Sequence, residues 1–180
     1  MSEYTFTGGD KLQSALKELS KKVRNASSLS VGWPEGATYP DGTPVAYVAA
    51  IQEFGAPKRK IPPAAFFRQM INEHSGEWGG NIAKALEMFD YDAEKALELI
   101  GQRIEEQLTD SIINTDRPEL SPITLMLRKM RMEDPDLIVT GKTVGIAASL
   151  VASGADYSGA STAKLNDTGV MLASIKSVVK

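Results

Sequence analysis

The sequence predicts an α+β fold, in which a long central helix and several shorter helices pack on a small, mainly antiparallel sheet. The strongest observation is an apolar stripe at helical spacing within residues 93–112, with most neighbouring carboxylates off the stripe. Two short segments, residues 29–33 and 175–179, have the apolar content of strands. We expect these segments and parts of residues 137–152 to form the sheet. The stripe consists of Ala93, Ala96, Leu97, Ile100, Ile104, Leu108 and Ile112.

The overall composition restricts the class of protein. The chain has 180 residues, with 20 Lys and Arg against 23 Asp and Glu and a net charge of −3. This balance disfavours a DNA-binding regulator, because nucleic-acid binders usually carry a basic excess. The absence of cysteine excludes disulfides, thiolate metal sites and cysteine nucleophiles. The length suits one domain over residues 1–180. No signal-peptide pattern or apolar run of ~20 residues is present, so we expect the protein to be made in the cytoplasm and to have no membrane contact.

The first half of the chain has three further helical patterns. Apolar residues recur at three- and four-residue steps from Leu12 to Val23, with Asp10 as a plausible N-cap. Residues 45–54 form a compact apolar run, which we interpret as a helix with Gly55 at its C-terminal cap, although a strand remains the alternative. A helix is expected to begin at Pro62–Pro63, since proline suits the first helical turn.

The second half is harder to interpret. Ser121 and Pro122 predict an N-cap followed by proline at the first helical position. Residues 143–152 are apolar with small side chains, and are compatible with either helix or strand. We expect residues 133–164 to be a loop-rich insertion.

No residue pattern predicts catalysis. His74 is the only histidine, and one histidine without cysteine cannot build a common zinc or iron site. Gly141–Lys142–Thr143 imitates the end of a phosphate-binding loop, but Asp136 occupies the position where that loop needs glycine. We therefore predict no catalytic residue, no metal site and no cofactor.

Two features predict an interface. Lys58, Arg59 and Lys60 form a basic loop, which is either ordinary solvated charge or a contact for an acidic partner surface or for DNA. Trp33, beside Pro34, is either a core residue at the end of a strand or an exposed interface anchor. We choose Trp33 and the three basic residues as the candidate interface.

Ordered motifs also resemble a known family. Glu53–Phe54–Gly55 is followed by the proline-led segment IPPAAFFR at 61–68, the long helix, LSPIT at 120–124 and DTGVMLASI at 167–175. This order resembles the tail-completion and neck proteins of long-tailed bacteriophages and covers about two-thirds of the chain. Departures are Ala64–Ala65 where arginine-proline is frequent, and the insertion before the closing motif. The motif residues are Glu53, Phe54, Gly55, Pro62, Phe66, Phe67, Asp167, Thr168 and Gly169.

The physical roles expected of the motif residues are structural. Gly55 suits a turn with positive φ, the three phenylalanines Phe54, Phe66 and Phe67 are expected in the core, and Asp167 or Thr168 is expected to cap a short helix.

The resemblance implies a non-enzymatic virion protein of the head–tail neck or upper tail, acting in tail completion and head–tail joining. Its implied partners are further copies of itself in a ring of about six or twelve subunits, connector or portal-proximal proteins, and the tail terminator or tail tube, with packaged DNA nearby. The alternatives from other classes are a small phage hydrolase or nuclease and a DNA-binding regulator.

Overall fold

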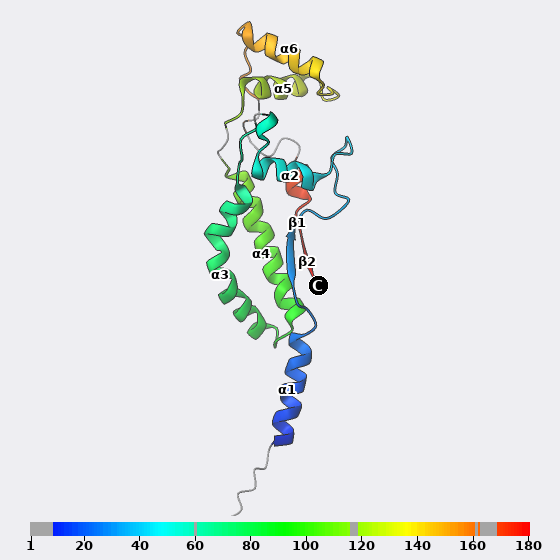
Figure 1. The fold of residues 1–180 in the computed structure, drawn as a ribbon, viewed down its shortest axis with the longest axis vertical. Helices are drawn as coiled ribbons and strands as arrows, with labels where there is room; N and C mark the ends of the chain where they lie inside the picture. Colours follow the sequence, from blue (N-terminus) through cyan, green and yellow to red (C-terminus); the bar gives the residue numbers. More distant parts are fainter. Residues whose placement is uncertain (1–8, 60, 116–118, 161, 163–168) are drawn as a thin grey trace, which may run out of the picture.

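The computed structural model describes residues 9–59, 61–115, 119–160, 162 and 169–180. Within them, the elements lie along one long axis, with helix α1 at one end and the pair α5 and α6 at the other (Figure 1). Most described residues are helical, and the described sheet has two antiparallel strands, which confirms the α+β class. In chain order the elements are α1 (Gly9–Val23), β1 (Leu29–Gly32), α2 (Val45–Phe54), the 3₁₀ helix η1 (Pro57–Arg59), α3 (Phe66–Met88), α4 (Ala93–Ile113), α5 (Pro122–Glu133), α6 (Gly141–Ala152), α7 (Val170–Ala173) and β2 (Lys176–Val179).

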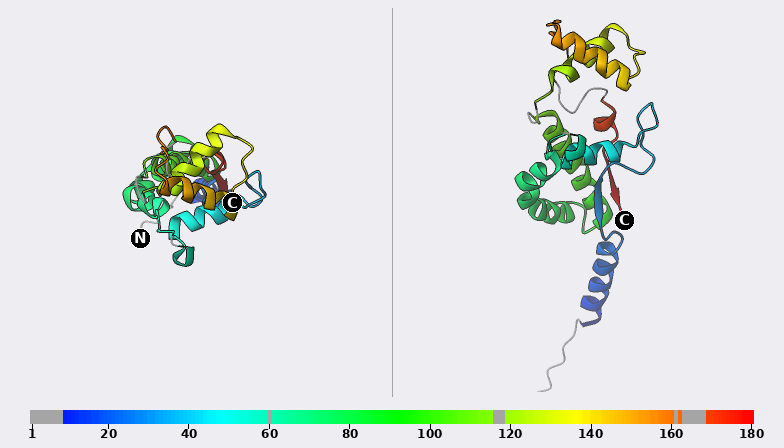
Figure 2. Two further views of the ribbon diagram at one scale, coloured as in Figure 1. Left: turned by 90° about the horizontal axis from the view of Figure 1, so that it is seen from above. Right: turned by 45° about the horizontal axis from the view of Figure 1, so that its top comes forward.

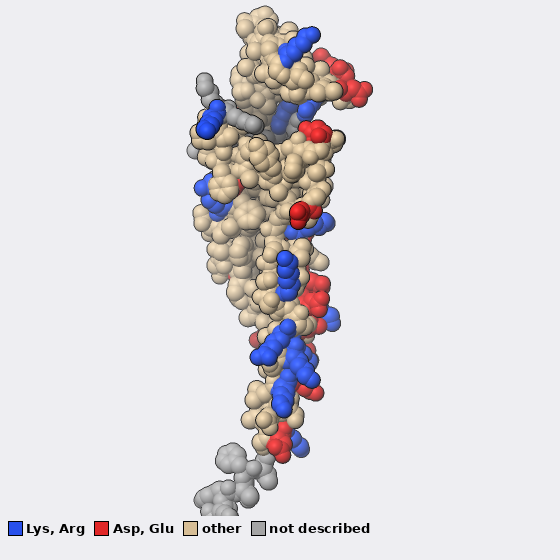
Figure 3. All heavy atoms as spheres, turned by 45° about the vertical axis from the view of Figure 1, so that its right-hand side comes forward, with Lys and Arg blue, Asp and Glu red and all other residues tan. Residues whose placement is uncertain are grey.

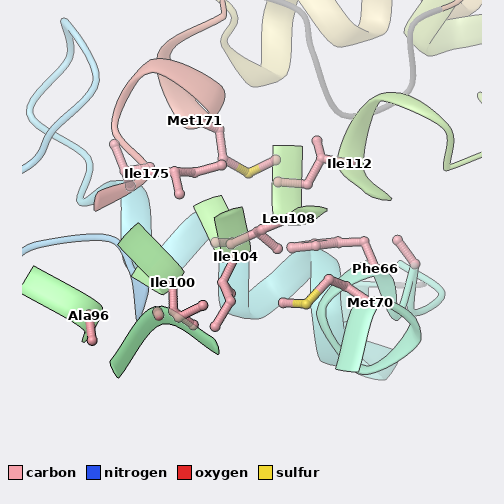
Figure 4. Packing of buried hydrophobic residues seen from close by; sticks show 13 residues of the cluster. Phe66, Met70, Ala96, Ile100, Ile104, Leu108, Ile112, Met171 and Ile175 are labelled. Atoms are coloured by element: carbon pink, nitrogen blue, oxygen red, sulfur yellow. The ribbon is translucent and has the colours of Figure 1, made fainter. Parts of the chain in front are cut away.

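Helix α4 is the centre of the fold, as its apolar stripe predicts. It packs against α3 on one side and against both strands on another. Six of the seven residues of the predicted stripe are buried, and Leu97 is half-buried. The core continues from α4 to Phe66 and Met70 of α3, to Met171 of α7 and to Ile175 after it (Figure 4).

A glycine permits the close approach of α4 to the sheet. A Cβ atom on Gly101 would lie 2.7 Å from Cβ of Ser177 and 3.0 Å from Cδ1 of Leu29. Glycine inside a helix costs about 1 kcal/mol relative to alanine, and here the contact with the sheet offsets that cost. The backbone N–H of Ser177 also donates to the carboxylate of Glu105, which fixes β2 along the helix.

The sheet pairs segments that are distant in sequence. In its register Leu29 lies opposite Val179 and Gly32 opposite Lys176. The prediction of strands at residues 29–33 and 175–179 is therefore confirmed to within a residue at the ends. The prediction of a strand within residues 137–152 is wrong, because residues 141–152 form helix α6.

Helix α6 begins with a capping box that explains why this segment is helical. The hydroxyl of Thr140 accepts from the backbone N–H of Thr143, and the hydroxyl of Thr143 accepts from the N–H of Thr140. Helix α5 has the predicted cap, with the Ser121 hydroxyl accepting from Thr124 N–H at 3.1 Å and Pro122 following. The two helices pack on each other beyond α2 and α7 (Figure 2).

The turn between α3 and α4 carries the N-cap of α4. The Asp92 side chain accepts from Lys95 N–H at 3.3 Å and from the amide of Asn25 at 2.8 Å. The hydrogen bond from Asn25, followed by the one from Lys95 N–H, lowers the pKa of the Asp92 carboxyl. Asn25 in turn accepts from Glu94 N–H, so the segment after α1 is attached to the start of α4.

Candidate functional site

The corner between α2 and α3 contains the Glu53–Phe54–Gly55 triplet and the segment at 61–68. Helix α2 ends at Gly55, whose N–H donates to Ile51 O at 2.8 Å. Gly55 has φ of 75°, and a Cβ there would lie 2.7 Å from the carbonyl oxygen of Ile61. Both the left-handed conformation and the close backbone require glycine. The predictions of a C-terminal cap and a positive φ at Gly55 are confirmed.

Glu53 caps helix α3 from a neighbouring helix. The N-cap residue of α3, Ala65, has φ of 55° and offers no side-chain oxygen. The Glu53 carboxylate, whose residue is only 5% exposed, accepts from the backbone N–H of Phe67 at 2.8 Å and of Arg68 at 3.3 Å. A carboxylate at a helix N-terminus satisfies unpaired N–H groups and interacts favourably with the helix dipole.

Arg68 compensates the charge of Glu53 and closes the corner. Its Nε donates to Oε1 of Glu53 at 2.7 Å, and a terminal nitrogen donates to the Glu53 carbonyl oxygen at 2.9 Å. The guanidinium also lies 5.3 Å from the ring centroid of Phe54. The two motif segments are therefore joined by one carboxylate and one arginine.

The segment between η1 and α3 is extended, which corrects the predicted helix start. Ala56 and Ile61 form an antiparallel bridge, and Ala64 N–H donates to Gln52 O at 2.7 Å. Because the backbone of residues 61–64 follows this path, α3 begins at Phe66 and not at Pro62–Pro63. Pro62 instead belongs to the extended segment at residues 61–64, which we call the strap and whose backbone approaches Gly55.

The three phenylalanines have different environments. Phe66 is fully buried and Phe67 packs partly buried against the core. The prediction that Phe54 is a core residue is wrong, since it is 67% exposed. The buried positions of α2 are Val45, Ala49 and Glu53, at four-residue steps, so Phe54 lies off that face.

Trp33 packs against the edge of the core beside this corner. Its ring makes an edge contact with Phe66, with centroids 6.1 Å apart, and a tilted contact with Phe67 at 6.4 Å. Its indole N–H donates to Met171 O at 2.8 Å. Trp33 is half-buried, so the structure gives it the packing of a core residue, and its role at an interface stays a prediction.

An uncharged apolar surface remains on the outside of α2. Ala46, Tyr47, Ala50 and Phe54 are exposed, and the only charged residue of the helix, Glu53, is buried. Arg68 borders this surface through Phe54. Tyrosine, other aromatic residues and arginine are the types enriched in protein interfaces. We define these four residues with Arg68 as the α2 surface, a candidate for binding another protein.

Sequence reasoning did not single out Tyr47 or Arg68. The signal available was a lone carboxylate, Glu53, inside an otherwise uncharged helix, since a buried carboxylate needs hydrogen-bond donors and a cation.

The other predicted site residues are only partly described. Lys58 is exposed in η1, whereas the side chain of Arg59 and all of Lys60 lie outside the described residues. Asp167 and Thr168, predicted as helix caps, also lie outside them. The N-cap residue of α7 is Gly169, with φ of 71°.

The residues considered for chemistry have ordinary structural positions. His74 is half-buried on α3, and the Gly141–Lys142–Thr143 segment is the start of α6, with Thr143 in its capping box. Among the described residues, no group of three or more His, Asp or Glu side chains is placed to hold a metal ion. Within the same ranges no helix is both long and apolar enough to cross a membrane.

Comparison with known proteins gives no family for this chain. No protein-family model, curated protein sequence or solved structure matches it.

Proposed function

We propose that the chain is a non-enzymatic structural protein of a tailed bacteriophage, located at the head–tail neck or upper tail end. In this role it completes the tail and joins it to the head, as one of about six or twelve copies in a ring. The observation that carries the proposal is the ordered motif set. Its first two segments meet in one corner, where Glu53, Gly55 and Arg68 hold α2 against α3.

The surface of the described residues supports an assembly role. Apolar side chains are exposed on α1, on the α2 surface, on α5, where Met132 is 64% exposed, and in the segment between α5 and α6, where Ile138 is 76% exposed. These surfaces lie at different places along the molecule (Figure 1). A subunit of a ring needs two different patches for its neighbours, and an adaptor needs further surface for its partners. The proposed partners are connector or portal-proximal proteins and the tail terminator or tail tube.

Deletion of the gene in the phage genome tests the location. We expect filled heads and free tails to accumulate separately in the lysate, with normal DNA replication, and purified protein added to that lysate to restore infectious particles. Loss of DNA replication, or normal assembly without the protein, would contradict the proposal. Electron microscopy of the lysate and the titre after complementation are the measurements.

A matched pair of phenylalanine variants tests the α2 surface in the same complementation assay. We expect Phe54→Ala to retain the fold, because the lost cation–π contact is worth about 1 kcal/mol or less at an exposed site. An interface aromatic contributes roughly 2 kcal/mol or more, so the titre should fall at least about tenfold. Phe66→Ala should instead reduce the free energy of unfolding by about 3–5 kcal/mol. Full activity of folded Phe54→Ala would exclude this surface from joining.

A further inference from the structure

The outer edge of strand β1 has backbone groups that no described residue pairs. Ser28 and Lys180 exchange two backbone hydrogen bonds, at 3.0 and 2.9 Å. Because the direction of these bonds alternates along an antiparallel ladder, the N–H and C=O groups of Leu29 and Val31 point away from β2. Within the described ranges no hydrogen bond reaches these four groups. An edge of this kind is a template for an additional strand.

The two edges of the sheet differ in their protection. On β2, the outward N–H of Ser177 already donates to the Glu105 carboxylate, and the exposed residues Lys176 and Lys180 lie at the ends of the strand. Lysine side chains on an edge strand discourage pairing with another chain. Strand β1, Leu29–Gly32, has neither a charged residue nor a proline. The β1 edge is therefore the one suited to accept a further strand.

The sequence at residues 4–7, Tyr-Thr-Phe-Thr, has the composition of such a strand. These residues precede α1 and lie outside the described residues. All four are aromatic or β-branched, which are the types enriched in strands. Aromatic residues and threonines also alternate, as the side chains on the two faces of a strand do. This segment is thus a candidate to occupy the β1 edge.

We propose that residues 4–7 of one copy add to the β1 edge of a second copy as an antiparallel strand. Phe6 then lies opposite Leu29 and Tyr4 opposite Val31, and each pair exchanges two backbone hydrogen bonds. All four outward groups of β1 are paired in this way. Main-chain hydrogen bonds of this kind are how an extended peptide binds to the edge of a sheet.

The side chains of this register match the two faces of the sheet. Leu29 and Val31 pack partly buried against the core, and the two aromatic rings of the added strand lie beside them. Ser30 is exposed on the other face, opposite Thr5 of the added strand. Aromatic residues beside β-branched ones, and threonine beside serine, are favourable cross-strand neighbours.

The position of α1 decides which copy supplies the strand. Lys22 pairs with Asp90, and the Asn25 amide donates to Asp92 at 2.8 Å, so the end of α1 is attached to the turn between α3 and α4. From this turn α1 and the sheet extend in opposite directions (Figure 1), and Figure 3 shows α1 projecting from the body.

The distance along α1 excludes pairing within one chain. Helix α1 is roughly 22 Å long, so its start at Gly9 lies about that far from the turn at which β1 begins. The three residue steps from Gly9 back to Phe6 span at most about 11 Å. Phe6 therefore cannot reach Leu29 of its own chain while α1 keeps this position, and a second copy is the partner.

The contact joins two different parts of the molecule, so it is heterologous and can continue from copy to copy. Closure of such a series into a ring rests on the proposed function, whereas the pairing itself does not. A strand of four residues is much smaller than the roughly 20–30 residues per side of a standard interface. A single contact is therefore weak, and its repetition around a ring supplies the stability.

Cysteine cross-linking of the full-length protein tests the pairing, because the chain contains no cysteine of its own. A Thr5→Cys protein is mixed with a differently sized, tagged Ser30→Cys protein and oxidised, so that the mixed disulfide joins two copies. The matched control partner is Val178→Cys, which is 45% exposed and lies opposite Ser30 in β2.

The two partners differ in their distance from the added strand. Thr5 lies directly opposite Ser30, with Cβ atoms about 5 Å apart, but two strand spacings, or about 10 Å, from Val178. A disulfide needs Cβ atoms within about 4.5 Å, so we expect at least about tenfold more mixed product with Ser30→Cys than with Val178→Cys. Equal yields from the two partners would overturn the proposal.

Two further variants separate the alternatives. Phe6→Pro in the Thr5→Cys protein removes the N–H that bonds to Leu29, so the yield should fall to that of the control, whereas Phe6→Val should retain most of it. An unchanged yield with Phe6→Pro would contradict a strand. A Thr5→Cys/Ser30→Cys double variant that closes only within one chain would show that the segment pairs with its own β1, and would also overturn the proposal. Because the purified protein is used, the outcome does not depend on head–tail joining.

Discussion

Replacement of Glu53 by alanine is expected to loosen the corner between α2 and α3. The carboxylate accepts from Phe67 N–H, Arg68 N–H and Arg68 Nε at 2.8, 3.3 and 2.7 Å. Hydrogen bonds to a charged group are each worth about 1.5–3 kcal/mol. The Arg68 side chain is 54% exposed, however, so solvent screening reduces the contribution of its ion pair with Glu53. We expect a loss of about 3 kcal/mol in the free energy of unfolding, or roughly 6–12 °C in melting temperature for a chain of this length.

Arg68→Ala is the matched variant for Glu53→Ala. It removes the ion pair, which is partly screened because the Arg68 side chain is 54% exposed, and the contact with Phe54, but leaves the Glu53 carboxylate on the two backbone N–H groups. The expected loss is therefore about 1–2 kcal/mol, smaller than that of Glu53→Ala. Chemical denaturation of both variants and of the double variant gives the three free energies. Equal losses in the two single variants would refute the conclusion that Glu53 acts mainly as the cap of α3.

Three further variants test other parts of the fold. Gly55→Ala should cost at least about 2 kcal/mol by denaturation, from the left-handed φ and the contact with Ile61 O together, and normal stability would mean that the strap moves freely. Gly101→Ala should destabilise despite the better helix former, by about 1–2 kcal/mol, because overpacking against Ser177 exceeds the gain in propensity; a stabilised protein would contradict that contact. The lowered pKa of Asp92 means that its carboxylate stabilises the fold above the unfolded pKa of about 3.9, and that this contribution disappears as pH falls through the folded value. The difference in melting temperature between wild type and Asp92→Ala should therefore shrink from pH 7 to pH 3, and a constant difference would show that the charge is not involved.

The sequence was sufficient where one strong pattern decided the structure. The stripe of α4, the Ser121–Pro122 cap and the glycine after α2 each follow from local rules, and all three are confirmed. The placement of Phe54 was wrong because α2 is apolar on both sides, so its amphipathic pattern is weak. The four-residue spacing of Val45, Ala49 and Glu53 identifies the buried face of α2 correctly, but only if a carboxylate is accepted as a core residue.

Other features depend on partners that are distant in sequence. The capping of α3 depends on contact between Glu53 and Arg68, which are 15 positions apart in the chain. No local propensity predicts this contact. For α1, the pattern predicted a helix correctly, but an apolar face does not say whether its own chain or another chain covers it. The small apolar residues at 143–152 are compatible with helix or strand, so their pattern did not predict the secondary structure. The capping box formed by Thr140 and Thr143 favours the helix.

The pairing of β1 with β2 has a consequence for the order of folding. Ser27 and Lys180, which hydrogen-bond at the end of the sheet, are 153 positions apart, whereas Trp78 and Gln107, which join α3 to α4, are 29 apart. Loop closure costs roughly 1.5 kcal/mol more for the longer separation, about a tenfold lower probability of encounter. We therefore expect α3 and α4 to associate while the chain is still being synthesised, and the strands to join them only after β2 is made. Until then, the side of α4 around Gly101 has no cover, and the transition state for folding should contain the two helices but not the sheet.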